Sequence, residues 1–248
     1  MPLLETEAVV LRTYRLGEAD KIVSLFTRQA GLLRVVAAGA QRPKSRYGGT
    51  LEPLSYVRLW LFEREHRDLV RLNSAELIES FFEMQKDYRL QVAAQYVAEV
   101  SERFLPEREV NERAFRLLLA ILRGLKQSGE IGRPLLYFNY WMLRLGGFLP
   151  DLEHCAGCGR AVGTEGGYYG PGSEGLCCAA CRSGQQARAV SARALGALLP
   201  GCQTTLDRWL RTEQAPKGVQ EVRSFFEELV ASHAGKTLLT RQFLAEVE

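Results

Sequence analysis

Two pairs of cysteines with the same internal spacing constrain this chain more than any other feature. Cys155 and Cys158 form the first CxxC pair, Cys178 and Cys181 form the second, and nineteen residues separate the pairs. That separation falls within the C-x₂-C-x₁₅₋₂₀-C-x₂-C pattern of zinc sites. Two intervening residues let both thiolates of a pair reach one ion from a tight turn. We therefore predict that these four cysteines bind one Zn²⁺ per chain.

The same set of ligands predicts a structural rather than a catalytic metal. Four thiolates close a tetrahedral shell and leave no position for a reactive water. Gly157 and Gly159 permit the turn that the first pair requires. Two alternatives are ordinary buried cysteines and a thioredoxin-like redox pair, although a redox pair would not need the second CxxC. Cys177 could replace Cys178 only by breaking the two-residue spacing, so we assign Cys178 as the ligand.

The remaining cysteines and the apolar segments indicate where the chain acts. Cys202 lies outside the cluster and is expected in the core, while His154 is expected to be a solvated neighbour. The sequence begins without the basic start and apolar stretch of a signal peptide. Its longest apolar runs fall far short of the ~18 residues that cross a bilayer. We expect a cytoplasmic, nucleoid-associated protein with no membrane contact, whose thiols are reduced.

The first 80 residues predict a small β-barrel. Short runs rich in β-branched and aromatic residues alternate with turn-forming segments. The predicted strands are residues 7–12, 22–27, 32–38, 55–62 and 69–74. The segment 39–49 is too glycine-rich and charged for a core element and is expected to be a loop. Five strands with a long loop after the third match an OB-fold, although an SH3-like barrel would give almost the same pattern.

After about residue 81 the apolar period changes from two to about 3.6, which predicts helices. The expected helices start near residue 88, follow the N-cap Asn111 to residue 125, and cover 135–145, 191–199, 219–232 and 237–247. The predicted fold class is α+β. It has an OB-fold DNA-binding domain at 1–80, an α-helical domain at 81–150 and 182–248, and a four-cysteine zinc-binding insertion (a zinc finger) at 151–181.

Basic residues are concentrated near the N-terminus. The whole chain has a net charge of only +3, but residues 11–46 contain eight basic and two acidic side chains. Phosphate contacts dominate nucleic-acid affinity and need accessible cations, although a single basic run is more often solvated surface. The predicted DNA-contacting residues are Lys21, Arg34, Arg42, Lys44 and Arg46.

The predicted strand 55–62 has two different faces. Val57, Leu59 and Leu61 form an apolar face, and the alternate positions carry aromatic residues and an arginine. Aromatic rings beside an arginine could stack on bases. The same face could instead pack against the helical domain, and the sequence leaves both possibilities open.

With barrel, basic loop, helical body and cysteine cluster in this order, the chain resembles the bacterial recombination mediator family RecO. The resemblance extends over nearly the whole chain, and the cysteine and basic-loop motifs are its specific parts. The matching segments are residues 18–27 with Gly31, the basic loop at 39–45, the approach to the first cysteines at 145–152, the cysteine motifs at 155–159 and 175–181, and the closing helix at 235–244. Cys177 falls at an apolar position of the family pattern, and Gln41 stands where the family often has another basic residue.

The resemblance implies a function that composition and spacing do not supply. A RecO-like protein would bind single- and double-stranded DNA and anneal complementary strands. It would associate with RecR, contact single-strand-binding protein, and help load RecA during repair.

Two other functions fit the sequence less well. A metal-dependent nuclease needs an open metal site, usually with His or carboxylate ligands, but the chain has only three scattered histidines, His66, His154 and His233. Phosphate-loop, GxSxG and HExxH motifs are absent from the sequence. We therefore expect no enzymatic activity. An RNA-binding or transcription-associated OB and zinc protein is excluded only by the family resemblance.

Overall fold

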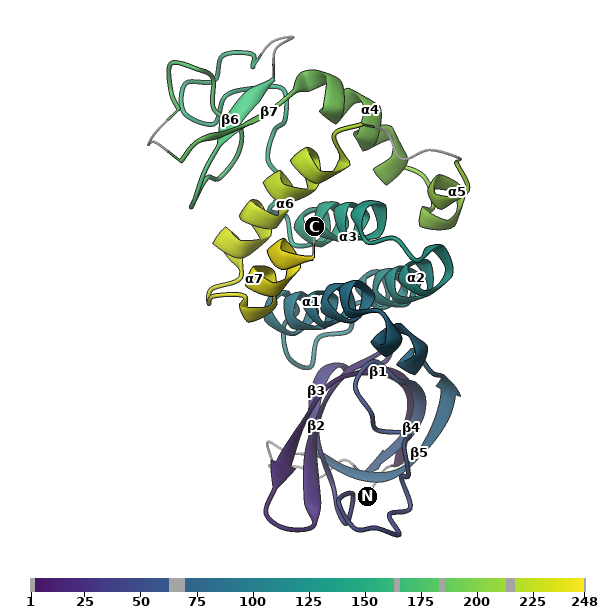
Figure 1. Cartoon of the computed structure of the whole chain (residues 1–248). Helices are drawn as coiled ribbons and strands as arrows, with labels where there is room; N and C mark the ends of the chain where they lie inside the picture. Colours follow the sequence, from purple (N-terminus) through teal and green to yellow (C-terminus); the bar gives the residue numbers. More distant parts are fainter. Residues whose placement is uncertain (1–2, 63–69, 163–165, 183–185, 213–216, 248) are drawn as a thin grey trace. The chain divides into compact units, whose positions relative to one another are not determined.

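The computed structural model describes residues 3–62, 70–162, 166–182, 186–212 and 217–247 (Figure 1). The predicted strand start at residue 69 and His66 lie outside these ranges. The chain divides into two compact units, residues 1–119 with the last two residues, and residues 120–246. In the described residues, no helix is long and apolar enough to span a bilayer.

The first unit contains a closed five-stranded barrel. Its strands are β1 (Leu3–Leu16), β2 (Asp20–Thr27), β3 (Gly31–Ala37), β4 (Tyr56–Phe62) and β5 (Val70–Glu79). They follow the order β1-β2-β3-β5-β4, with β1 also paired to β4 and with a parallel pair between β3 and β5. This topology is OB-like and confirms the predicted barrel.

Strand β1 is longer than predicted because it pairs on both sides. Its first half pairs with β4 from Leu3 to Val9, and its second half continues along β2 to Leu16. A bulge between Val10 and Arg12 shifts the register with β2. Polar residues such as Arg15 hid the end of this strand from a prediction based on apolar alternation.

The barrel interior is filled by the inward-facing residues of every strand. Val10, Leu25, Val35, Leu59 and Leu72 are among these buried residues. The long segment between β3 and β4 is a series of turns, as expected for a loop. However, its Tyr47 and Leu51 are only 2% exposed and belong to the barrel core. The prediction of a loop is confirmed, but it did not indicate that the segment between β3 and β4 adds two residues to the barrel core.

Helical elements complete the first unit. The 3₁₀ helix η1 (Phe82–Lys86) leads into α1 (Tyr88–Phe104), whose first turn is capped by the Asp87 side chain. Helix α2 (Glu112–Ser128) belongs to the first unit only up to residue 119. It starts after Asn111, whose side-chain oxygen accepts a hydrogen bond from the Ala114 N–H at 3.0 Å. The N-cap predicted at Asn111 is confirmed.

Helices and a two-stranded sheet form the second unit. Its helices are α3 (Gly132–Leu145), α4 (Ala192–Cys202), α5 (Leu206–Leu210), α6 (Val219–His233) and α7 (Leu239–Glu246). Strands β6 (Gly167–Tyr169) and β7 (Arg188–Val190) pair next to the cysteine segment. Helix α5 and the two short strands were not predicted, because three to five residues are too few to display a period.

Candidate metal centre and nucleic-acid interface

The four predicted ligands come together in the folded chain. The sulfur atoms of Cys155, Cys158, Cys178 and Cys181 all lie within 4.8 Å of one another. The Sγ atoms of Cys158 and Cys178 are 3.8 Å apart. Four sulfurs at ~2.3 Å from a tetrahedral Zn²⁺ would be separated by about 3.8 Å. The donor set and its spacing therefore fit a metal ion, and these residues could hold one.

Two similar turns present the sulfurs. In the first, the Gly159 N–H donates to the Cys155 carbonyl at 2.8 Å, and Gly159 has a φ of +72° that favours glycine. In the second, the N–H groups of Cys181 and Arg182 both donate to the Cys178 carbonyl at 3.0 Å. A Cβ on Gly157 would lie 3.3 Å from the Cys181 Cβ, so a small residue lets the two turns approach.

The environments of the thiols differ. The Cys178 N–H donates to the Cys155 sulfur at 3.2 Å, and this bond lowers the Cys155 pKa to about 6. The pKa of Cys178 is also lowered, chiefly by a hydrogen bond from the Cys181 N–H. Hydrogen bonds to the side chains of Cys158 and then Cys178 raise the pKa of Cys181 to about 12. A divalent cation at the centre of the cluster would favour the thiolate form of these cysteines.

Neighbouring side chains lie outside the sulfur cluster. Cys177 forms a β-bridge with Tyr168 through two 2.8 Å backbone hydrogen bonds. His154 directs Nδ1 to an Asp151 oxygen at 2.7 Å. Cys202 is fully buried, and burial raises its pKa to about 12. Among the described residues, none of these three belongs to the group that could hold a metal.

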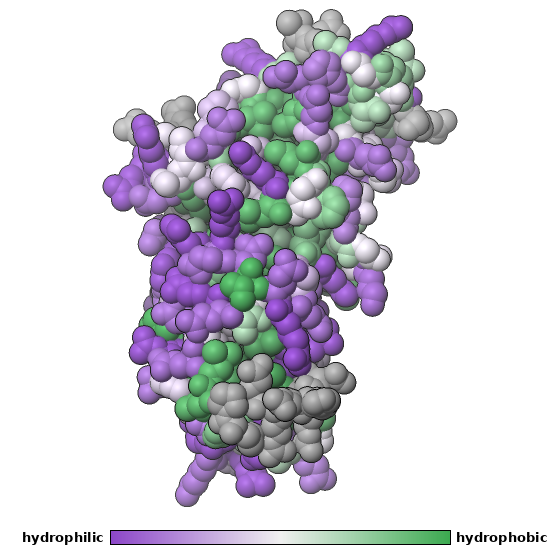
Figure 2. Space-filling model, turned by 180° about the vertical axis from the view of Figure 1, so that it is seen from behind, coloured by the Kyte–Doolittle hydropathy of each residue, from purple (hydrophilic) through white to green (hydrophobic). Residues whose placement is uncertain are grey.

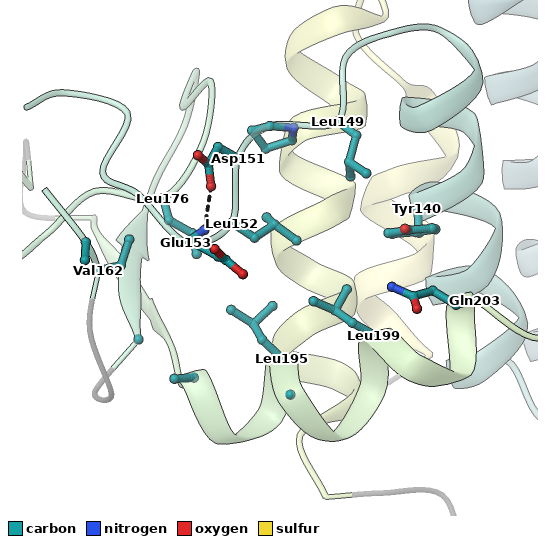
Figure 3. A pocket seen from close by; sticks show the side chains of 15 residues that line it. Tyr140, Leu149, Asp151, Leu152, Glu153, Val162, Leu176, Leu195, Leu199 and Gln203 are labelled. Atoms are coloured by element: carbon teal, nitrogen blue, oxygen red, sulfur yellow. Dashed lines mark hydrogen bonds between the residues drawn. The ribbon is translucent and has the colours of Figure 1, made fainter. Parts of the chain in front are cut away.

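A pocket of about 670 Å³ lies beside the cysteine segment in the second unit (Figure 3). Its walls are mainly apolar and include Leu149, Leu152, Leu195 and Leu199. Figure 3 shows the Asp151 carboxylate accepting a hydrogen bond from the Glu153 N–H at 2.8 Å, in the turn that leads to Cys155. The pocket is lined both by α4 and by the segment that leads to Cys155.

The basic loop, defined here as residues 39–46, is fixed at one end of the barrel. The Gln41 N–H donates to the Ala19 carbonyl at 2.9 Å, and its side-chain amide donates to the Asp20 carbonyl at 2.6 Å. The Asp20 side chain in turn accepts from the Gly39 N–H at 2.8 Å. Gln41 therefore holds the basic loop against the β1–β2 turn through both its backbone and its side-chain amide.

The five candidate DNA-contacting cations have different surroundings. Arg42 and Lys44 are exposed, and no carboxylate of the described residues pairs with them. Arg46 stacks on the Tyr47 ring and donates to its hydroxyl at 2.8 Å. Lys21 lies 3.7 Å from Glu52, and Arg34 lies 3.4 Å from Glu107 on the outer surface of β3. Among the described residues, no carboxylate pairs with Arg42, Lys44 or Arg46, which all lie on the basic loop, and of these three only Arg46 is engaged by another side chain, that of Tyr47.

The face of β4 that carries aromatic residues and an arginine has a different environment at each end. Tyr56 is buried, contacts the Phe115 ring at 6.3 Å between centroids, and donates to a Glu7 oxygen at 2.8 Å. At the other end, Arg58 is exposed and Phe62 is half-buried. Trp60 donates to Glu5 at 3.2 Å. Within the first unit, packing on a helix explains only the Tyr56 end of this face.

Comparison with known proteins supplies the family. A family model described as "Recombination protein O N terminal" matches residues 1–81, and one described as "Recombination protein O C terminal" matches residues 85–242. A DNA repair protein RecO from Koribacter versatilis is 37% identical over 247 residues, which cover 99% of this chain and 100% of that protein. The protein of the same name from Desulforudis audaxviator is 34% identical over 253 residues, 100% of this chain and 98% of that protein.

Proposed function

Because the chain belongs to the recombination protein O (RecO) family of DNA repair proteins, we propose that it is a non-enzymatic mediator of recombination. In this proposal it binds single- and double-stranded DNA and anneals complementary strands. It acts with RecR, contacts single-strand-binding protein, and so helps RecA to load. The family assignment places its role in DNA repair, and the particular steps are the proposal.

The observation that carries DNA binding is the pair of unpartnered cations on the basic loop. A cation that is paired with a carboxylate, such as Lys21 or Arg34, must break that ion pair before it binds a phosphate. Among the described residues, no carboxylate pairs with Arg42 or Lys44, so these two cations can bind a phosphate directly. We assign the main phosphate contacts to these two residues. Lys21, Arg34 and Arg46 contribute secondary contacts, because each already interacts with Glu52, Glu107 or Tyr47 respectively.

The cysteine cluster has a structural role in this proposal. We assign Cys155, Cys158, Cys178 and Cys181 as ligands of one Zn²⁺, which ties residues 151–181 into a defined shape. The OB-like domain at 1–80 binds DNA, and the helical domain at 81–150 and 182–248 carries the metal insertion. Four protein ligands would leave the metal no open position for hydrolysis, which supports a role without catalysis.

Annealing of complementary strands tests this function directly. Two labelled complementary oligonucleotides are mixed with the purified full chain, without nucleotide, and duplex formation is followed by energy transfer. The protein should accelerate annealing, and the same strands coated with single-strand-binding protein should anneal faster when RecR is added. A chain that binds neither single strands nor duplexes at low salt would overturn the proposal.

The RNA-binding alternative is distinguished by competition. Unlabelled RNA and DNA strands of the same sequence are titrated against a labelled single-stranded DNA bound to the protein. Equal or stronger competition by RNA would favour the alternative, since the 2′-hydroxyl is the group by which a protein separates the two. Stronger competition by DNA is the expected result.

A further inference from the structure

One set of outward-facing residues forms a continuous line across neighbouring barrel strands. Leu3 on β1 is paired with Phe62 on β4, and Phe62 is paired with Arg71 on β5. The same line continues through the other strands. Arg71 is paired with Val36 on β3, Val36 with Ile22 on β2, and Ile22 with Tyr14 on β1. We call these six residues the outer belt.

The outer belt is partly exposed, whereas some other outward positions of the same strands are buried. Tyr14 is 46% exposed and Leu3 is 50% exposed, Arg71 is exposed, and the other three are half-buried. By comparison, the outward-facing Phe26 of β2 is fully buried against Phe115. Figure 2 shows hydrophobic residues reaching the surface in the barrel part of the molecule. A barrel would ordinarily carry polar residues at such positions.

Positive charge accompanies the apolar and aromatic groups of the outer belt. Arg71 lies within it, between Phe62 and Val36. Arg71 is exposed, and no carboxylate of the described residues pairs with it. The basic loop starts three residues after Val36 and supplies further cations to the barrel domain.

The outer belt matches the chemistry of a polymer with planar faces and a negative backbone. Aromatic rings bind bases by stacking, and nearby arginines contact phosphates. From Phe62 to Tyr14 the belt crosses four strand intervals, about 19 Å along the curved sheet at ~4.8 Å each. That distance accommodates several nucleotides of an extended strand. A duplex hides its base faces in the stack and could use only the cations.

We infer that the outer belt is a stacking surface for the bases of single-stranded DNA, with Tyr14 and Phe62 as the stacking rings and Arg71 as a phosphate contact. This inference rests on the proposed DNA-binding function and specifies which form of DNA uses this surface. The basic loop then serves both forms, whereas the aromatic residues of the outer belt contribute only to the single-stranded form.

The test compares the double variant Tyr14→Ala/Phe62→Ala with the wild-type full chain. A matched control is Tyr88→Ala/Phe82→Ala, which removes the same two ring types from positions 55% and 60% exposed, away from the outer belt. Binding is measured by fluorescence anisotropy with a labelled thymidine oligonucleotide, a duplex, and an abasic strand that retains only the sugar-phosphate backbone. Circular dichroism and thermal unfolding establish that each variant is folded.

The expected result is a loss of single-strand affinity of about 5- to 160-fold for each stacking ring that is removed, and therefore of at least about 5-fold in the double variant. Stacking is not ionic, so the loss should be the same at low and high salt. Affinity for the duplex and for the abasic strand should stay within about twofold of the wild type. Tyr14→Phe should bind like the wild type, because it keeps the ring.

Two outcomes would overturn the inference while leaving DNA binding intact. One is wild-type affinity of the folded double variant for the thymidine strand, which would make the outer belt a surface for another partner, such as a protein. The other is an equal loss for thymidine and abasic strands, which would show that the rings act through the fold rather than by stacking. By contrast, a wild-type chain that binds no DNA contradicts the proposed function itself.

Discussion

The backbone N–H of Cys178 donates a 3.2 Å hydrogen bond to the sulfur of Cys155, so one CxxC turn directly supports the other. The two residues are 23 positions apart in the chain. Hydrogen bonds from backbone N–H groups stabilise a thiolate, which is the form that a metal binds. The fold thus stabilises the thiolate form of Cys155 in addition to positioning its sulfur.

The purified protein should contain one zinc per chain, and Cys178→Ala should reduce this content strongly. The matched control is Cys177→Ala, which changes the adjacent cysteine, outside the sulfur cluster, and should keep full zinc content. Structural zinc supplies roughly 10–16 kcal/mol of binding free energy in small zinc-finger peptides. Elemental analysis measures the stoichiometry.

Limited proteolysis in the presence of a chelator should cut residues 151–182 before it cuts the barrel. Zinc-free protein that resists proteolysis there would contradict the assignment.

Removing the two unpartnered cations of the basic loop should change the salt dependence of DNA binding. Each phosphate contact contributes about −0.7 to the slope of log K against log salt for a single strand. Arg42→Ala/Lys44→Ala should therefore flatten the slope by about 1.4, and adding Arg46→Ala should flatten it by about 2 in all. The control Arg193→Ala/Arg208→Ala removes two exposed cations of the second unit. Equal slopes for the loop variants and the wild type would exclude these phosphate contacts.

Two glycines with similar backbone angles should respond very differently to alanine. Gly31 has a φ of +66° and Gly17 a φ of +60°, but only Gly31 faces a close neighbour. A Cβ on Gly31 would lie 2.1 Å from the Glu109 carbonyl oxygen, while a Cβ on Gly17 would meet nothing within 4 Å. Gly17→Ala should cost only the left-handed backbone penalty, about 1–2 kcal/mol. Gly31→Ala should cost clearly more, and urea unfolding would reject this account if the two variants were equally stable.

The aromatic ring of Phe115 should be a major source of stability in the first unit. It is fully buried, contacts the rings of Phe26 and Tyr56, and lies 5.1 Å from the Arg28 guanidinium. Phe115→Ala should lower the free energy of unfolding by about 3–5 kcal/mol. Phe82→Ala, at an exposed position, should change it by less than about 0.5 kcal/mol. Urea titration measures both, and similar values would contradict the packing role of Phe115.

The parts of the site that are local in sequence could be predicted from it. The cysteine quartet follows from spacing, since two residues between thiols set the geometry of each turn. The predicted strands lie where apolar and polar residues alternate, so the barrel could be predicted as well. The burial of Tyr47 and Leu51 was missed because glycines and cations surround them, although their spacing of four residues is an apolar signal within a polar segment.

The outer belt could not be predicted, because it depends on register between strands far apart in the chain. Val36 and Arg71 become neighbours only through the parallel pair of β3 and β5. The bulge after Val10 decides which side chains of the end of β1 point outward, and a single-residue shift would turn Tyr14 inward. The two ends of β4 likewise have different surroundings, buried at Tyr56 and half-buried at Phe62. Only the tertiary arrangement distinguishes these ends, since both carry aromatic residues.

The pairing of β1 on both sides also has a consequence for how the protein is made. Strands β1, β2 and β3 can pair in the order in which they leave the ribosome, as successive hairpins. The other edge of β1 must wait for β4, as the Glu5–Trp60 side-chain hydrogen bond across 55 positions illustrates. Contacts between distant residues form slowly, and an unpaired strand edge can recruit other chains. The nascent chain therefore carries an open edge on β1 until β4 has been made and the barrel closes.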